Sequence, residues 1–328
     1  MGISIGVALL FLYLSFRQVS LDEVMESFYA IRPFYVLLAS LLVLLGLFLR
    51  AVRWYVILPS AKTIGILHLF RYFLVGCMLN NTMPARLGEI TKAFIVGRRE
   101  NLSKSMILAT SVTERIFDLC SVLILFFIAS FALPTASSFR KSALVVFVTL
   151  CLMMILMATA YFKQKYLLDF VGHLLNFFPG RIQTKVFRIT QAFLKGFEIL
   201  SSQKNLLYAF LLSLSIWFLA CVPLLVLFYG FHLPLTFSHA ILLLSVISLG
   251  IMIPITPGNI GTMQFVCTYV LIFLNVNKHT GFLFSVMYHA IQFLPVTLIG
   301  FYFFLRMRLG LSKFQNLSHE TSQNSSHY

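Results

Sequence analysis

Charged residues are scarce in this chain, and acidic ones most of all. Only 11% of its 328 residues are charged, with 25 Lys and Arg against 10 Asp and Glu. Soluble globular domains use about one-quarter charged residues, so the composition excludes an ordinary soluble enzyme domain. Hydrophobic residues make up 59% of the chain. They come in uninterrupted blocks, which is the pattern of segments that cross a membrane.

Paired cysteines are also missing. The five cysteines stand alone in apolar sequence, without a CxxC pair or a neighbouring His at ligand spacing. We interpret them as small core residues, and we predict no metal, no cofactor and no catalytic residue. Residues 1–16 have the length of a signal peptide but lack a basic start and a small-x-small cleavage site before Arg17. We therefore expect a retained first span. The polar residues 309–328 are predicted to form a disordered tail.

The blocks predict one polytopic, all-α membrane domain over residues 1–308, with about six to eight transmembrane helices. Six blocks are candidates for single spans: about residues 1–16, 34–58, 106–133, 142–162, 205–230 and 280–305. Two further blocks, 65–83 and 236–256, each reach a Pro and Gly interruption and are followed by a shorter piece, 87–97 and 261–275. Broken helices of this form often enter the membrane and return on the same side.

The formal charge of +15 predicts orientation and not nucleic-acid binding, because basic residues collect in the cytoplasmic loops of membrane proteins. The loop 163–204 carries seven Lys and Arg and is expected to be cytoplasmic. Arg50, Arg53 and Lys62 after the second span agree with this assignment. Both termini are then cytoplasmic, and Arg140 and Lys141 are placed outside against the rule. Within the basic loop, residues 181–199 are predicted to form an interfacial amphipathic helix.

The two interruptions resemble each other. Both contain Pro-x-x-x-Gly, as Pro84 to Gly88 and as Pro257 to Gly261, and each is followed by a long apolar helix with a polar cluster. With the orientation above, the two hairpins enter from opposite sides, which predicts an inverted repeat of about residues 65–133 and 236–305. Such repeats are a common plan of transporters. The alternative is that Pro and Gly only kink ordinary spans.

The span 106–133 carries a polar stripe. At 100° per residue, Thr110, Ser111, Glu114, Arg115 and Asp118 share an arc of about 140°. Each ionised group near the bilayer centre costs about 2.5 to 3.5 kcal/mol, so the stripe needs partners or a hydrated cavity. Arg115 is expected to pair with Glu114 or Asp118.

Other polar residues near the first interruption extend this stripe. Arg86 or Arg71 is expected to complete a network with Glu89. One interpretation is a structural salt-bridge cluster that holds the first hairpin. The other assigns Arg86 and Arg115 to a lipid phosphate, since guanidinium binds phosphate through two hydrogen bonds.

Residues of the second interruption complete the candidate site. His289 is a candidate proton carrier or a hydrogen-bonded core residue, and the interruptions expose backbone amides to an anionic group. The candidate substrate-binding or translocation residues are Asn81, Pro84, Arg86, Gly88, Glu89, Glu114, Arg115, Asp118, Pro257, Gly258, Gly261, His289 and Gln292.

At these positions the sequence resembles the lysylphosphatidylglycerol synthase transmembrane region family, a flippase-like membrane domain. The resemblance covers about residues 5–308. It is carried by Arg53-Trp54, Asn81-x-x-Pro84-x-Arg86-x-Gly88-Glu89, Thr113-Glu114-Arg115-x-x-Asp118 and Pro254-x-Thr256-Pro257-Gly258-x-x-Gly261. It implies a cytoplasmic-membrane protein that handles anionic or isoprenoid-linked lipids. No soluble aminoacyl-transferring domain is present in this sequence, and Gln264 stands where Glu is expected in relatives.

Three functions follow from these features. The first is a lipid translocase that passes a polar head group between the two hairpins while the acyl chains stay in lipid. The second is a membrane glycosyltransferase that uses a polyprenyl-phosphate sugar, with Asp22 and Glu23 as its acidic pair. The third is a scaffold for a lipid-modifying enzyme. We favour a transporter over an enzyme, with membrane lipids as partners.

Overall fold

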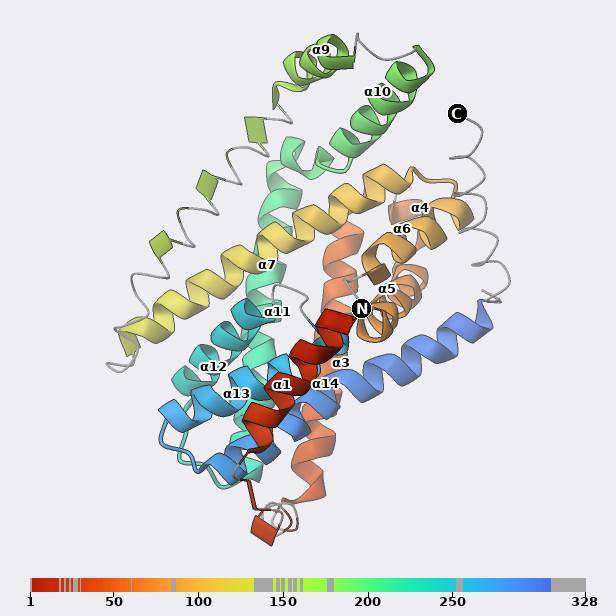
Figure 1. Cartoon of the computed structure of the whole chain (residues 1–328). Coiled ribbons are helices and arrows are strands. Elements are labelled where there is room, and N and C mark those ends of the chain that lie inside the picture. Colours follow the sequence, from red (N-terminus) through yellow and green to blue (C-terminus); the bar gives the residue numbers. More distant parts are fainter. Residues whose placement is uncertain are drawn as a thin grey trace.

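The computed structural model describes residues 2–17, 19–20, 22–23, 25, 29, 31–59, 61–83, 87–132, 144–145, 148, 151–152, 155, 158–159, 162–175, 180–251 and 256–307. Every regular element within these ranges is a helix (Figure 1), as the apolar blocks predict. The predicted tail 309–328, the charges Arg140 and Lys141, and most of the predicted span 142–162 lie outside the described residues.

Five of the predicted spans coincide with single helices. They are α1 (Gly2–Phe16), α3 (Pro33–Ile57), α7 (Lys104–Ala132), α11 (Gln203–Gly230) and α14 (Lys278–Arg306). Within the described residues, α3, α11 and α14 are long and apolar enough to cross a membrane. Their starts follow local rules, because Pro is favourable in the first turn of a helix and Ser or Asn side chains cap free N–H groups. Thus Pro33 opens α3, while Ser202 and Asn277 cap α11 and α14.

Both interruptions divide the chain into pairs of short helices. The first hairpin comprises α5 (Ile66–Thr82) and α6 (Leu87–Arg99), and the second comprises α12 (Phe237–Gly250), the short 3₁₀ turn η4 (Pro257–Asn259) and α13 (Thr262–Phe273). The four α-helices have 17, 13, 14 and 12 residues. A helix needs about 20 residues to span the hydrocarbon core, so each helix is shorter than a full crossing. The opposite insertion of the two hairpins, and with it the inverted repeat, stays a prediction.

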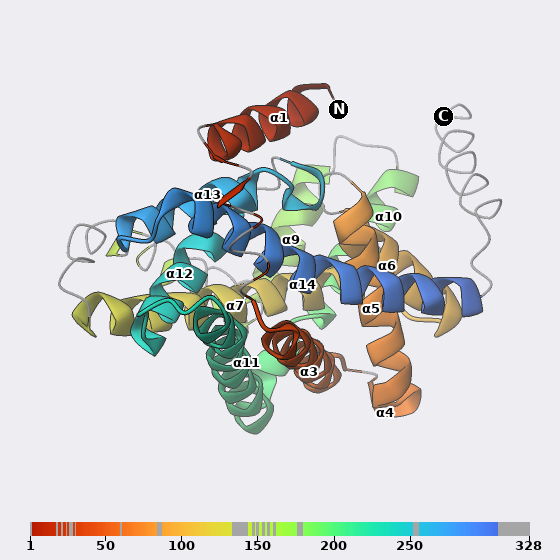
Figure 2. The same ribbon diagram turned by 90° about the horizontal axis from the view of Figure 1, so that it is seen from below.

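The long helices form the frame that holds the hairpins. Helices α3 and α11 lie side by side, whereas α7 and α14 run across them (Figures 1 and 2). Helix α5 packs against α14, and α12 packs against α7. Helix α1 covers the second hairpin from the opposite side, where Phe11 stacks on Phe265 of α13. Each hairpin therefore packs against a long helix, the first against α14 and the second against α7.

Two apolar cores surround the position where the hairpins meet. One is built mainly by α11, α12, α13 and α14 around Leu224, Leu243 and Phe284. The other is built mainly by α3, α5, α6 and α7 around Trp54, Val75 and Ile107. Buried charged side chains such as Arg53 and Asp118 therefore have packed apolar groups around them. Water screens the attraction between such charges only weakly.

The basic loop contains two helices, α9 (Gln164–Leu175) and α10 (Gly180–Lys195), and the short turn η3 (Glu198–Ser201). Helix α10 covers most of the predicted amphipathic range 181–199. At its end, Leu194 and Phe197 are buried against Ala109 of α7, so this loop is attached to the membrane domain. The remaining short helix, α4 (Ala61–Ile64), precedes α5. The cytoplasmic side of this loop and its position at the lipid interface stay predictions.

Close packing within the first hairpin depends on Gly88. A Cβ atom at this position would lie less than 3.0 Å from the backbone carbonyl oxygen of Gly76 and the backbone nitrogen of Asn80. We therefore expect Gly88→Ala to destabilise the protein by about 1 to 3 kcal/mol, as overpacking usually does. Thermal unfolding of the purified protein in detergent measures this. In the control Gly172→Ala, on α9, the new Cβ meets nothing within 4 Å, and stability should not fall. Equal losses in both variants would contradict the close packing.

Candidate functional site

Asp118 of α7 is the acceptor for donors from three helices. Its Oδ1 lies 2.7 Å from Arg53 Nη1, 2.9 Å from Trp217 Nε1 and 3.3 Å from Arg50 Nη1. Arg115, one helical turn before Asp118, places Nη1 3.5 Å from Oδ2, so the predicted local pair is present. The side chains of Asp118 and Arg53 are 7% and 1% exposed. Asp118 therefore fixes α3 and α11 against α7.

Glu89 of α6 is a second acceptor. Its Oε1 lies 2.6 Å from Arg115 Nη2, and its Oε2 lies 3.0 Å from Lys92 Nζ. Asn80 Nδ2 is 3.4 Å from Oε1. Lys92 is 3% exposed and lies over the ring of Trp54, with 4.6 Å between Nζ and the ring centroid. These contacts attach the second helix of the first hairpin to α7.

Glu114 joins the two acceptors into one network. Its Oε1 is 3.6 Å from Arg53 Nη2, and its Oε2 is 3.6 Å from Lys92 Nζ. We call this set the ion network, and among the described residues it consists of the carboxylates Glu89, Glu114 and Asp118 with the cations Arg50, Arg53, Lys92 and Arg115. These members leave one positive charge in excess, which an anion is suited to neutralise.

The four cations differ in accessibility. Arg53 and Lys92 are fully enclosed, whereas the side chain of Arg115 is 48% exposed and that of Arg50 is 21% exposed. A ligand is able to reach the last two without opening the fold. Arg53 and Lys92 are therefore placed to hold the network together, and Arg50 and Arg115 are placed at its surface.

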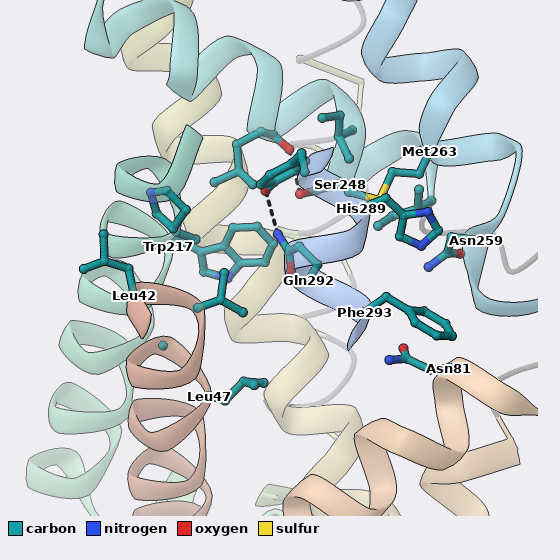
Figure 3. A pocket seen from close by; sticks show the side chains of 18 of the residues that line it. Leu42, Leu47, Asn81, Trp217, Ser248, Asn259, Met263, His289, Gln292 and Phe293 are labelled. Atoms are coloured by element: carbon teal, nitrogen blue, oxygen red, sulfur yellow. Dashed lines mark hydrogen bonds between the residues drawn. The ribbon is translucent and has the colours of Figure 1, made fainter. Parts of the chain in front are cut away.

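A cavity of about 250 Å³ adjoins the ion network, since Arg50 is one of its lining residues. Figure 3 shows side chains that line this cavity. We call it the Trp217 cavity. Residues of α3, α5, α11, α12, η4, α13 and α14 line it. Its polar lining residues are Arg50, Asn81, Ser248, Asn259, Tyr288, His289 and Gln292, and its apolar ones include Leu42, Leu47, Ile216, Trp217, Met263 and Phe293. Arg50 thus belongs both to the ion network and to the cavity wall.

The cavity lies where the two interruptions touch. A Cβ atom on Gly258 would be 2.8 Å from the backbone oxygen of Asn81, so α5 and η4 are in direct contact. Asn81 also donates from Nδ2 to Thr297 Oγ1 of α14 at 3.0 Å. Asn81 and Asn259 point toward the same region from the two hairpins, with Phe293 between them in Figure 3. The structure therefore brings together the two interruptions that the sequence pattern paired.

His289 of α14 holds the second interruption through hydrogen bonds on both ring nitrogens. Nε2 is 3.0 Å from the backbone oxygen of Gly258, and Nδ1 is 2.8 Å from Gln264 Nε2. Gln264 Oε1 accepts from the backbone N–H of Gly261 at 2.8 Å. This pair repeats the arrangement of Glu89 with Arg115, since a polar side chain of the second hairpin helix again contacts the following long helix. In the second hairpin the link is uncharged.

Comparison with known proteins places the chain among membrane proteins. A protein-family model described as the lysylphosphatidylglycerol synthase TM region matches residues 1–300. The chain belongs to this family. It is therefore an integral membrane protein, as its helices also indicate.

Several archaeal proteins described as UPF0104 membrane proteins are similar to this family member. The protein from Methanocaldococcus jannaschii is 24% identical over 227 residues, which are 68% of this chain and 91% of that protein. The protein from Pyrococcus horikoshii is 26% identical and covers 81% of this chain and 85% of its own length. The protein from Methanothermobacter thermautotrophicus is 22% identical, with 85% and 87% covered. No solved structure matches the chain.

Not every candidate residue of this family member joins the site. Pro84 and Arg86, and Pro254 of the resemblance, lie outside the described residues. Pro257 opens η4 and Gly261 precedes α13, so both shape the backbone. Gln292 donates to the hydroxyl of Tyr288 at 2.7 Å and lines the cavity.

Two residues invoked for other roles have contacts of their own. Arg71 lies over the ring of Phe303 at 5.7 Å, and not at Glu89 as expected. Of the alternative acidic pair Asp22 and Glu23, Glu23 lies 3.4 Å from His279. Within the described part of the chain, no three His, Cys, Asp or Glu side chains form a group suited to a metal ion.

Sequence reasoning missed four residues of the site. Arg50 and Arg53 were assigned to the cytoplasmic flank of a span, but both bind Asp118 within the fold. Lys92 and Trp217 stand in α6 and α11 without a recognisable motif around them. The available signal was the charge balance, because three carboxylates in a membrane need more cations than Arg115 alone supplies.

Proposed function

We propose that this chain is a translocase for a phosphate-bearing lipid of the cytoplasmic membrane. The head group passes along the ion network and the Trp217 cavity, and the acyl chains remain in the bilayer. One observation carries the proposal: Arg50 connects a network with an excess positive charge to a cavity formed at the contact of two broken helix pairs. Transporters commonly bind substrates where such broken helices meet. The family takes its name from a synthase of a lipid, which supports lipid as the substrate class.

The charge of the network supports an anionic head group. Burying cations costs free energy unless anions accompany them, and the described members hold four cations against three carboxylates. A phosphate supplies the missing charge and accepts two hydrogen bonds from one guanidinium. Arg115 is the most exposed cation and is placed to meet the head group first, while Glu89 keeps it oriented at 2.6 Å.

The orientation is part of the proposal. Positive charges in the loop that contains α9 and α10 place this loop in the cytoplasm, with both chain termini on the same side. The proposed substrate is an anionic phospholipid or an isoprenoid-linked lipid. The proposed partner is a lipid-modifying enzyme that supplies or consumes this lipid.

Leaflet exchange in vesicles tests the function. The purified protein is reconstituted with head-group-labelled phosphatidylglycerol or a labelled prenyl-phosphate sugar, and an impermeant quencher measures the lipid that reaches the outer leaflet. We expect Arg115→Ala and Glu89→Ala to reduce exchange to the rate of protein-free vesicles. Arg115 is 48% exposed, so folding of Arg115→Ala should be retained. Glu89→Ala takes the nearest carboxylate from the enclosed Lys92, so its exchange rate is compared only after its melting point shows a folded protein.

Arg71→Gln is the matched control, because it removes an arginine of the same membrane domain that stacks on Phe303 away from the ion network. Its exchange rate should equal that of the wild type. Folding of every variant is checked by its elution from a sizing column and its melting point. Wild-type exchange rates in folded Arg115→Ala and Glu89→Ala would leave the ion network with a structural role only.

A further inference from the structure

The Trp217 cavity is lined by one cation and by several neutral polar groups. Arg50 is its only charged lining residue among those described, and no carboxylate lines it. The other polar lining groups include three carboxamides, from Asn81, Asn259 and Gln292. Carboxamides both donate and accept hydrogen bonds but carry no charge, so they suit hydroxyl groups. The cavity thus offers one cation for a phosphate and several neutral partners for what the phosphate carries.

Arg50 is held less tightly on Asp118 than Arg53, the other arginine of α3, is. Its Nη1 lies 3.3 Å and 3.4 Å from the two carboxylate oxygens, longer than the usual range of about 2.7 to 3.2 Å. Asp118 Oδ1 already receives Arg53 at 2.7 Å and Trp217 at 2.9 Å. An arginine has five N–H donors, so Arg50 is able to bind a second anion without leaving Asp118 unpaired.

Asn259, which lies across the cavity from Trp217 in Figure 3, provides the clearest sign of a ligand. Its side chain makes no hydrogen bond to any described residue, although it belongs to the cavity wall. It stands in η4 with a φ of 59°, a left-handed conformation that Asn tolerates better than most residues. The backbone of the second interruption therefore holds an unpaired carboxamide against the cavity (Figure 3).

Ammonium groups find no anionic partner in the described lining of this cavity. The described lining contains no Asp or Glu, and the face of Trp217 is already covered by Arg50, whose Cζ is 5.1 Å from the ring centroid. A cation–π site for an amine is therefore occupied. The volume of about 250 Å³ is below the about 300 to 1,000 Å³ of common ligand pockets, which favours a small head group.

We propose that the Trp217 cavity selects a lipid with one phosphate and a small, uncharged, hydroxyl-bearing head group, and that Arg50 and Asn259 are its specificity-determining residues. Arg50 binds the phosphate, and Asn259, Asn81 and Gln292 bind the hydroxyls. Glycerol and hexose head groups both have this chemistry. Amine-bearing head groups are disfavoured, including the lysyl form in the family's name. This inference rests on the proposed function, which brings a lipid into the cavity. It concerns which head group binds and not how the lipid is moved.

Trp217 provides a reporter for the test. The chain has two Trp residues, and Trp54 is fully buried and does not line the cavity, so Trp54→Phe leaves Trp217 as the single fluorophore. Because this substitution also removes the hydrogen bond from Trp54 to Thr110, the melting point of the variant is compared with that of the wild type first. Short-chain phosphatidylglycerol, phosphatidylethanolamine, lysylphosphatidylglycerol and a short prenyl-phosphate hexose are titrated in detergent. Ligand-induced shifts of the melting point of the protein with both Trp residues give a second measurement. We expect saturable binding of phosphatidylglycerol or the prenyl-phosphate hexose, and the stronger of these two identifies the lipid source.

Two substitutions test the assigned residues. Arg50→Gln should weaken binding about tenfold to a hundredfold, the range of a lost hydrogen bond to a charged group, with Arg71→Gln as the unchanged control. Asn259→Asp keeps the shape and adds a carboxylate, so it should weaken phosphatidylglycerol and strengthen phosphatidylethanolamine.

The binding and transport experiments test two different proposals, so either proposal can be contradicted without the other. Equal binding of the amine and hydroxyl lipids by the wild type, or unchanged binding by Arg50→Gln, would overturn the assignment. Selective binding without leaflet exchange would leave this inference standing and remove the translocase. Leaflet exchange without head-group selectivity would support the translocase and overturn the selectivity proposed here.

Discussion

Asp118→Ala is expected to destabilise the protein by about 3 to 5 kcal/mol, because removing one partner of a buried ion pair leaves the other charge uncompensated. Arg53 is 1% exposed and has its closest carboxylate contact with Asp118, at 2.7 Å. Arg50 and Trp217 lose the same acceptor. Thermal and guanidinium unfolding in detergent measure the loss, followed by circular dichroism at a helix wavelength.

Two further variants distinguish a lost ion pair from general damage. Asp169→Ala removes an exposed carboxylate of α9 and should change stability by less than about 0.5 kcal/mol. The double variant Asp118→Leu with Arg53→Met removes both charges and should regain part of the loss, since replacing a buried pair by apolar groups is often neutral. A melting point of Asp118→Ala equal to that of the wild type would show that Arg53 is not held by this carboxylate.

The helices were largely predictable because their signals are local. Apolar runs of spanning length give α3, α11 and α14, and the Pro-x-x-x-Gly interruptions fall between α5 and α6 and between α12 and α13. Helix α12 ends at Gly250, before the predicted end of its block at 256. These features depend on residues that are neighbours in sequence. The polar stripe on α7 was predictable for the same reason, since Glu114, Arg115 and Asp118 lie on one helical face.

The partners of that stripe were not predictable from one sequence. Arg53 is 65 residues from Asp118, and the same arginine equally fits a cytoplasmic flank. Trp217 is 99 residues from Asp118 and stands within an apolar helix, where an aromatic residue carries no sign of a polar contact. Which cation meets which carboxylate depends on how α3, α7 and α11 pack, and this packing is a property of the whole fold. A cavity is likewise defined by distant segments, so the Trp217 cavity had no signal of its own.

Gly258→Ala is expected to stop leaflet exchange, because it forces the two hairpins apart. The new Cβ would lie 2.8 Å from the backbone oxygen of Asn81, and a backbone atom in α5 is not free to rotate away. Gly258 also has a φ of 58°, which adds strain of about 1 to 2 kcal/mol for an L-residue. The exchange assay with labelled lipid measures the function, and thermal unfolding measures the stability.

Gly65→Ala separates the contact from the strain. Gly65 has a φ of 79° and a ψ of 149°, a region almost restricted to Gly, but nothing lies within 4 Å of its would-be Cβ. Its substitution therefore costs at least as much backbone strain as that of Gly258 without touching the hairpin contact. If only Gly258→Ala loses exchange, the loss comes from the contact of η4 with α5. If folded Gly258→Ala still moves lipid at the wild-type rate, the head group does not pass where the two interruptions meet.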